Sequence, residues 1–408
     1  METPRCQSGK RLSPAEAKLL LLAARPSWSE EQKALADELV PQVTQWPVFI
    51  DTARRKFALP MVYENLVTLI DSPPPAEATA ALRALSLRAT AEILRRHAAF
   101  DWFHGTCVLP SGVAHAYFKG PALAAQFYPD PMQRFFRDVD ILVPARQRMA
   151  LMQIMLENGC KVFRKAPSGF EVLSFHSEAD IRDYLYLTDV PSILTPQGLP
   201  LELHATLDHR TALFDSAGML ERACEVTLNQ NRLSVLANSD HAVYLSYHHT
   251  RHLWSKLNWL ADIAAVVTHP DIDLNTIRAQ HSKTTRLGST VAATLELHQL
   301  ASTACHPEDF TNRTPGGDLL RVCVDGLHGD LELEREMKQG RQIHTVGFDW
   351  QRNAPAWRRY QLSLRGYLHL KYDDVRSIHG PRTFRYSWAL ALKLRRVAQR
   401  LIGRSVQR

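Results

Sequence analysis

The chain has 408 residues, of which 45% are hydrophobic and 22% are charged, as is usual for a globular protein of two or three domains. No apolar run reaches the roughly 18 residues that a transmembrane helix requires, and the six cysteines are scattered without a C-x-x-C pair. These features argue against a disulfide framework and a cysteine-ligated zinc site, and we expect a cytoplasmic protein.

Residues 1–105 are predicted to form an N-terminal helical domain. Ser13-Pro14-Ala15-Glu16 places serine at the N-cap, proline at the first helical position and glutamate at N3, a pattern that begins a helix. Ser29 opens a second helix in a similar way, and Ala76–Phe100 is rich enough in alanine and leucine to form a long amphipathic helix. No residue pattern here indicates chemistry, so we interpret this part as a helical cap or substrate-side domain.

The stretch Phe118-Lys119-Gly120-Pro121 joins a strand predicted over Val113–Phe118 to a helix predicted over Ala122–Tyr128. Gly120 permits a tight turn, and Pro121 is tolerated in the first turn of a helix because its missing N–H would have no partner there. The amides at a helix N-terminus attract anions, and Lys119 adds a full positive charge. The sequence therefore predicts an anion site at Lys119 and Gly120.

Two carboxylates follow on a strand predicted over Asp138–Val143. Asp138 and Asp140 are expected to share one face, since side chains alternate between the faces of a strand. Two neighbouring carboxylates repel each other unless a cation lies between them, and Mg²⁺ prefers carboxylate and phosphate oxygens. A phosphate cradle followed by a carboxylate pair is an arrangement that phosphoryl or nucleotidyl transfer requires.

The next part of the chain is predicted to be a mixture of helix and strand. A helix over Ala145–Asn158 is expected to end at Gly159. Three further strand candidates follow, namely Lys161–Arg164, Phe170–Phe175 and Tyr184–Leu187. Ile193–His204 reads as a strand, a turn and a second strand, with Glu202 and His204 on the face opposite Leu201 and Leu203. If this second strand lies beside the Asp138–Val143 strand, Glu202 completes a site of three carboxylates.

These residues resemble a known superfamily. Lys119-Gly120, the Tyr128-Pro129 loop, Arg134 and Asp138-Val139-Asp140 are similar to the nucleotidyltransferases of DNA polymerase β type, and in particular to a bacterial branch labelled uncharacterised nucleotidyltransferase. Leu201–His204 and the motif His248-x3-His252-x-Trp254-x2-Leu257-x-Trp259-x2-Asp262 resemble that branch as well. The resemblance covers roughly residues 110–265. The chain departs from the superfamily at Lys119-Gly120, where many members carry Gly-Ser, and at Glu202, where Asp is common.

The resemblance implies an α+β fold. A polymerase β-type nucleotidyltransferase palm, with a mixed β-sheet and helices, is expected over residues 106–235, flanked by N- and C-terminal helical domains. Asp138, Asp140 and Glu202 would be catalytic and would hold two Mg²⁺ ions. The phosphates of an NTP would contact the remaining predicted site residues, namely Lys119, Gly120, Arg134, Arg137 and His204.

The implied reaction is transfer of NMP from an NTP to a hydroxyl acceptor, with release of pyrophosphate. The acceptor stays open between a small molecule, a sugar, a peptide and an RNA end. Two other functions remain open. One is a non-catalytic protein of the same fold that binds a nucleotide or a partner, and the other is a phosphotransferase that moves the γ-phosphate.

Several polar residues have two interpretations at this point. Arg134 either orients the loop or contacts a phosphate, and both it and Arg137 are also placed to neutralise the aspartates. His204 either contacts substrate or stabilises the sheet. We interpret His248 and His252 as a polar face packed beside the nucleotide site, because position 249 lacks the glutamate of a helical metalloprotease motif. Asp262, within an apolar helix, is interpreted as a buried partner of Arg, His or Trp.

The C-terminal part is predicted to contain a helical domain over residues 236–345, including a charged stretch at Asp330–Gly340, and a basic, aromatic-rich tail over 346–408. Residues 381–408 carry eight basic residues and no acidic one, and removing these charges from the net +7 leaves −1 for the rest of the chain. A helix is predicted over Phe384–Ile402. We interpret its basic residues as a solvated face, with contact to an anionic membrane surface or to nucleic acid as the alternative.

Overall fold

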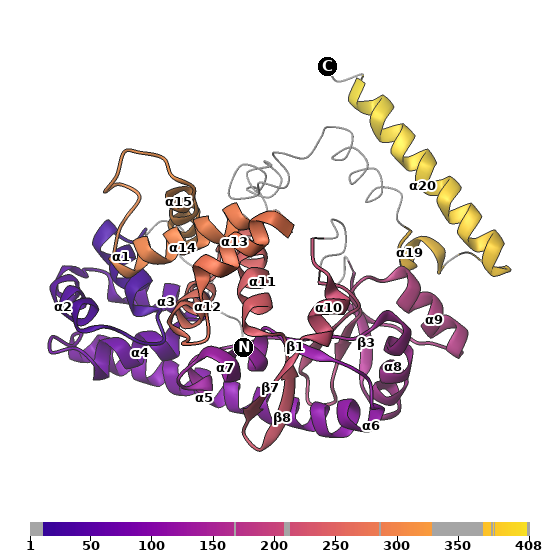
Figure 1. The fold of residues 1–408 in the computed structure, drawn as a ribbon, viewed down its shortest axis with the longest axis horizontal. Coiled ribbons are helices and arrows are strands. Elements are labelled where there is room, and N and C mark those ends of the chain that lie inside the picture. Colours follow the sequence, from indigo (N-terminus) through magenta and orange to yellow (C-terminus); the bar gives the residue numbers. More distant parts are fainter. Residues whose placement is uncertain are drawn as a thin grey trace. The chain divides into compact units, whose positions relative to one another are not determined.

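The computed structural model describes residues 11–166, 169–207, 213–284, 287–328, 370–376, 378 and 380–405. These residues form helices and a mixed sheet of eight strands, so the predicted α+β composition is confirmed (Figure 1). No helix in the described ranges is long and apolar enough to cross a membrane. The predicted charged stretch Asp330–Gly340 and residues 346–369 of the predicted tail lie outside the described residues.

The chain divides into two compact units. The first contains Met1–Ala98, Tyr117–Val139 and Ala223–Arg352, and the second contains Ala99–Ala116, Asp140–Arg222 and Asn353–Arg408. The four segments expected from the sequence, with boundaries at 105, 235 and 345, remain a prediction.

The N-terminal residues are helical, as the sequence predicts. The elements are α1 (Pro14–Ala23), α2 (Glu30–Leu39), a 3-10 turn (Val40–Gln42), α3 (Trp46–Arg55), α4 (Leu59–Thr68) and α5 (Ala76–Phe103). Ser13 caps α1 by accepting the Glu16 N–H at 3.2 Å, while the Glu16 carboxylate accepts the Ser13 N–H at 2.8 Å. This reciprocal pair satisfies two amides that a helix start otherwise leaves unpaired, and Ser29 caps α2 in the same way.

The rest of the first unit combines a short part of the sheet with a second group of helices. Its elements are β1 (Ala116–Phe118), α7 (Gly120–Phe127), a 3-10 turn (Pro131–Gln133), β7 (Cys224–Leu228), β8 (Asn231–Val235), α11 (Asn238–Arg251), α12 (Leu257–Thr268), α13 (Leu274–Thr284), α14 (Gly288–Ser302) and α15 (Pro315–His328). Here the strands are hydrogen-bonded in the order β1-β8-β7, with β1 parallel to β8 and β8 antiparallel to β7.

The core of the first unit depends on two helices that are buried on nearly all sides. In α1, the run Leu19–Leu22 has no exposed surface, because α1 packs against α2, α4 and α14. Helix α12 is similarly enclosed and packs against α7, α11 and α14. A helix that is apolar all round is stable only in such a position. The contact between α12 and α7 places Asp262, in the middle of α12, near the helix that follows the Lys119–Gly120 turn.

The second unit holds the other strands. Its elements are a π-helical turn (His104–Val108), α6 (Leu109–Ser111), β2 (Val139–Leu142), a 3-10 turn (Ala145–Gln147), α8 (Arg148–Glu157), β3 (Lys161–Ala166), β4 (Gly169–Val172), α9 (Glu178–Leu187), β5 (Ser192–Leu194), β6 (Pro200–His204), α10 (Ser216–Glu221), α19 (Tyr372–Val375) and α20 (Arg382–Ser405). The strand order is β4-β3-β5-β6-β2, with antiparallel pairing between β4 and β3, β3 and β5, and β5 and β6.

Several local predictions for this unit are confirmed. Gly159, with a φ of +82°, follows the last turn of α8 and donates its N–H to Leu156, while the next N–H bonds Met155, as in a Schellman motif. The predicted strand, turn and strand over Ile193–His204 form β5 and β6. In β6, Leu201 and Leu203 have no exposed surface, as the alternation requires.

One strand prediction is wrong and one hairpin was not predicted. Tyr184–Leu187 belongs to α9, which begins after Ser177, whose side chain accepts the Asp180 N–H at 3.2 Å. A four-residue apolar run has no period of its own, and the capped helix start upstream decides its conformation. The missed hairpin is β7 and β8, whose two-residue turn over 229–230 places Asn229 at a φ of +55°. Asparagine tolerates that conformation, so the signal was present in the sequence.

Candidate functional site

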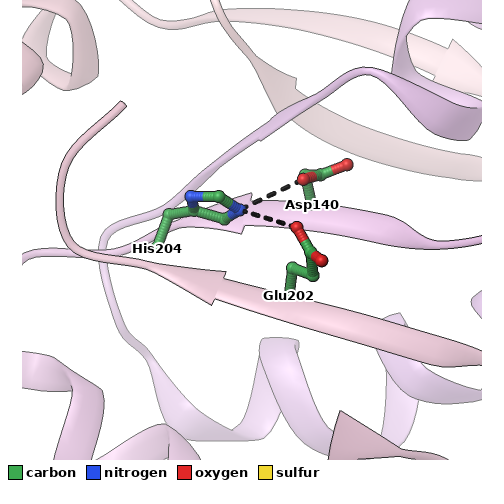
Figure 2. A group of neighbouring side chains, drawn as sticks. All are labelled: Asp140, Glu202 and His204. Atoms are coloured by element: carbon green, nitrogen blue, oxygen red, sulfur yellow. Dashed lines mark hydrogen bonds and ion pairs between the residues drawn. The ribbon is translucent and has the colours of Figure 1, made fainter. Parts of the chain in front are cut away.

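Three polar side chains from β2 and β6 lie together in the second unit. Asp140, Glu202 and His204 each offer one ligand atom, and these atoms lie within 4.8 Å of one another (Figure 2). The Nε2 atom of His204 is 3.1 Å from Asp140 Oδ1 and 3.5 Å from Glu202 Oε2. As predicted, β6 is the neighbour of β2, and the Val143 N–H donates to the His204 carbonyl at 2.9 Å.

The three side chains differ in their access to solvent. The Asp140 side chain is fully buried and that of His204 is 7% exposed, whereas that of Glu202 is 36% exposed. The group is therefore open to solvent along Glu202. Burying a carboxylate is unfavourable unless a cation or a hydrogen-bond donor compensates its charge. Two carboxylates and an imidazole are a donor set that fits a divalent cation.

Asp138 immediately precedes the strand that holds Asp140. Strand β2 begins at Val139, so the alternation that was expected to put Asp138 and Asp140 on one face does not extend to Asp138. Among the described residues, the group of mutually close ligand atoms contains Asp140, Glu202 and His204 and does not include Asp138. A role for Asp138 in metal binding remains a prediction.

The Lys119–Gly120 turn has an unusual backbone. Lys119 has a φ of +63° and Gly120 a φ of +50°, and α7 begins at Gly120, two residues earlier than predicted. The Lys119 N–H donates to His241 Nε2 at 3.3 Å, and the Gly120 carbonyl accepts from Arg134 Nη1 at 3.2 Å. A positive φ is unfavourable for lysine, so these partners stabilise the turn. Because His241 accepts the Lys119 amide, the predicted anion site depends on the Lys119 ammonium more than on this N–H.

Gly120 also lies close to the backbone beside Asp138. A Cβ atom at position 120 would be 3.0 Å from the Asp138 carbonyl oxygen, closer than real Cβ contacts ordinarily come. We therefore expect Gly120→Ala to lower the free energy of unfolding by about 1–2 kcal/mol, because both the positive φ and the close approach become unfavourable. Urea unfolding measures this change.

Gly112→Ala is the matched control for that substitution. Gly112 has a φ of +59°, but a Cβ there would meet nothing within 4 Å. The control therefore isolates the effect of φ, and Gly120→Ala should be the more destabilising of the two. Equal effects would show that the contact with the Asp138 backbone is unimportant.

Arg134 lies in a buried ionic network of the first unit. Its Nε and Nη2 atoms donate to the two carboxylate oxygens of Asp262 at 2.7 and 2.9 Å. Tyr128 Oη donates to Asp262 at 2.7 Å, and His249 Nε2 is 3.4 Å from the same carboxylate. Burial favours a raised pKa for Asp262, but the charge of Arg134 and the contact with His249 outweigh it and hold this pKa well below its usual range.

These contacts bear on two interpretations from the sequence. Asp262 is a buried partner of arginine and histidine, as predicted. Arg134 is 5% exposed at its side chain, and it contacts Gly120, so the geometry favours orientation of the loop over direct contact with a phosphate.

The remaining predicted residues contact aromatic rings. Arg137 is exposed, and its guanidinium lies 5.3 Å from the centre of the Phe57 ring. The rings of His248 and His252 pack against each other and against Trp259, with ring centres 4.6–5.7 Å apart. Burial and the nearby Lys119 charge hold the pKa of His248 well below its usual range.

His241 was not identified from the sequence, although it contacts the turn directly. Its Nδ1 lies 2.7 Å from the Gln126 side-chain oxygen, which only accepts, and its Nε2 accepts the Lys119 N–H. The ring is therefore neutral, with the proton on Nδ1. Burial and the Arg134 charge lower its pKa to about 3. His241 is seven residues before His248, so helical spacing would have placed both on one face.

These neutral histidines predict a pH-dependent stability. His241 and His249 have folded pKa values of about 3 and about 4, against the ordinary 6.5, so the unfolded chain binds more protons below pH 6.5. The free energy of unfolding should therefore fall as the pH drops from 6.5 towards 4, by up to about 1.4 kcal/mol per pH unit for each histidine. Urea unfolding at several pH values measures this slope.

His241→Gln tests the assignment, because its side-chain oxygen is able to accept the Lys119 N–H but does not titrate. The slope of the variant should be smaller by about one proton. A slope equal to that of the wild type would contradict a neutral, buried His241.

No curated protein matches the chain. A family profile described as "Uncharacterised nucleotidyltransferase" matches residues 42–301, which is more than half of the chain and includes the Lys119–Gly120 turn, the Asp140 group and Asp262. The chain therefore belongs to the uncharacterised nucleotidyltransferase family.

Proposed function

We propose that the protein transfers NMP from an NTP to a hydroxyl acceptor and releases pyrophosphate. The observation that supports this proposal most directly is the group of Asp140, Glu202 and His204, whose ligand atoms lie within 4.8 Å of one another in a chain of this family. Nucleotidyltransferases generally use a divalent metal ion and an NTP, and this group has the donor set for such an ion.

Asp140 and Glu202 would hold the cation, and Asp138, separated from Asp140 by one residue along the chain, would contribute to a second Mg²⁺ site. Mg²⁺ prefers oxygen ligands, so we assign to His204 the positioning of the Asp140 carboxylate, to which its Nε2 is already close at 3.1 Å. When bound, the cations would neutralise the triphosphate and make the acceptor hydroxyl more acidic.

The family resemblance implies that the Lys119–Gly120 turn contacts the phosphates of the NTP. The ammonium group of Lys119 supplies a positive charge beside the turn, and Gly120 allows close approach of the backbone. Arg134 would act through the turn, because it contacts the Gly120 carbonyl and Asp262. Arg137, which is exposed, is the further cation that we propose for the triphosphate.

In the reaction, the acceptor oxygen would attack the α-phosphorus as the bond to the bridging oxygen of the pyrophosphate breaks. The hydroxyl proton would pass to a carboxylate of the site, and pyrophosphate would leave with the bridging electron pair. The protein forms no covalent bond in this scheme, so its contribution is positioning and charge neutralisation.

The test is incubation with each of the four NTPs, labelled at the α-phosphorus, with Mg²⁺ and a lysate of the source cells. Transfer of label to a lysate component by the wild type, and not by Asp140→Asn, would support nucleotidyl transfer and make the acceptor available for identification. In a parallel incubation with ATP labelled at the γ-phosphorus, transfer of label with release of ADP would establish a phosphotransferase instead. Tight binding of NTP without consumption would favour the non-catalytic alternative.

A further inference from the structure

Helix α20 carries two pairs of exposed apolar side chains on its solvent-facing side. Phe384 and Trp388 are 53% and 52% exposed, and Leu390 and Leu394 are 39% and 47% exposed. The members of each pair are four residues apart and lie one turn from each other. At about 100° per residue, the two pairs are about 120° apart around the helix, so they form the two edges of a broad face opposite Ala389. The rings of Phe384 and Trp388 stack, with their centres 6.2 Å apart.

The opposite face of α20 is the one that packs on the second unit. Ala389 is 1% exposed and lies in a small apolar cluster with Leu187 of α9 and Val375 of α19. On the same side, Arg385 Nη2 is 2.6 Å from Asp183, and Lys393 Nζ is 3.0 Å from Asp374. The helix is therefore held by a largely basic face, and its large apolar side chains point away from that contact.

The charge around the exposed face is positive. Arg382 and Arg396 also contact Asp183 and Asp374, yet their side chains remain 54% and 64% exposed. Two carboxylates thus face four cations of α20, and the sequence from 381 to 408 contains no acidic residue. An aromatic and leucine face bordered by arginine is the arrangement of helices that lie in the plane of a membrane interface.

We propose that the apolar face of α20, formed by Phe384, Trp388, Leu390 and Leu394, binds the surface of a bilayer that contains anionic phospholipids. The aromatic and leucine side chains would enter the boundary between headgroups and acyl chains. Arg395, which is exposed and lies on the same side of the helix as Trp388, would contact lipid phosphates. Both contributions come from described residues of α20, and the proposal does not depend on nucleotidyl transfer.

Other occupants fit this face less well. A second copy of the helix would bring two basic segments together without an acidic partner, and like charges repel. Nucleic acid binds through cations that point outward, whereas Arg385 and Lys393 point towards carboxylates and the outward side chains are apolar. The exposed apolar face with a positive border therefore favours a lipid surface.

The experiment is co-sedimentation of the full chain with vesicles of phosphatidylcholine alone or with about 30% phosphatidylserine. We expect binding to the anionic vesicles and weaker binding at high salt, because salt screens the arginine contacts. Leu390→Glu together with Leu394→Glu should reduce binding by about tenfold or more, because two charges enter the face that contacts lipid. The thermal unfolding temperature of this variant should be unchanged, since both leucines are exposed.

The matched control is the double variant Leu87→Glu and Leu94→Glu on α5, where both leucines are also exposed, at 63% and 55%. It introduces the same two charges and should keep wild-type binding. Equal losses in the two variants would overturn the proposal, because net charge alone would then explain the binding. Failure of the wild type to bind anionic vesicles would also overturn the proposal. In that case, a dimer in light scattering that the α20 substitutions dissociate would identify a second copy as the occupant of this face.

Discussion

Replacing Asp140 with asparagine is expected to reduce nucleotidyl transfer by about a thousandfold or more while the protein stays folded. Asparagine keeps the shape of the side chain and an oxygen that accepts from His204, but it lacks the charge that holds a cation. A thousandfold loss corresponds to about 4 kcal/mol of activation free energy, within the range of charge stabilisation by a bound metal ion. Label transfer from NTP at saturating Mg²⁺ measures the loss.

Asp271→Asn is a suitable control for this substitution, since Asp271 is exposed in the loop between α12 and α13. It should transfer label at the wild-type rate. Asp138→Asn, measured in the same assay, tests whether Asp138 shares the role of Asp140. If it does, the rate of label transfer should fall about as far as in Asp140→Asn. Undiminished turnover by Asp140→Asn would remove the basis for the metal assignment.

Replacing Asp262 with asparagine should destabilise the protein by about 3–5 kcal/mol. The substitution leaves the guanidinium of Arg134 buried without a charged partner, and an uncompensated buried charge is among the most unfavourable changes in a protein core. Tyr128 also loses the charge of the carboxylate that accepts its hydroxyl at 2.7 Å. Urea unfolding near neutral pH gives the difference.

A double variant separates stability from positioning. Arg134→Met with Asp262→Leu removes both charges together, and apolar residues of similar volume often restore the stability of a buried ion pair. It also removes the hydrogen bond from Arg134 to the Gly120 carbonyl, so we expect a stable protein with an increased KM for NTP. Wild-type KM in this variant would show that Arg134 does not orient the turn. For the single variant Asp262→Asn, a decrease of less than about 0.5 kcal/mol in the free energy of unfolding would show that the ion pair of Arg134 and Asp262 is not needed for stability.

Features that depend on local rules could be predicted from the sequence alone. The serine caps of α1 and α2, the glycine that ends α8 and the alternation of Leu201, Glu202 and Leu203 in β6 are read from a few neighbouring residues. The placement of Glu202 on the strand beside β2 also agreed with the structure, because it came from a family resemblance that carries information about strand order.

Local rules failed where the signal was short or weak. The run Tyr184–Leu187 is too short to distinguish a strand from a helix, and α9 is fixed by the cap at Ser177.

Which polar residues meet depends on how distant parts of the chain pack together. The pairing of Arg134 with Asp262, and of Lys119 with His241, joins residues more than 100 positions apart in the sequence, which no local pattern specifies. The face of α20 that packs inward was likewise undetermined, because an amphipathic pattern states that two faces differ but not which one finds a partner. That choice depends on Asp183 and Asp374, whose carboxylates contact the basic face and leave the apolar face exposed.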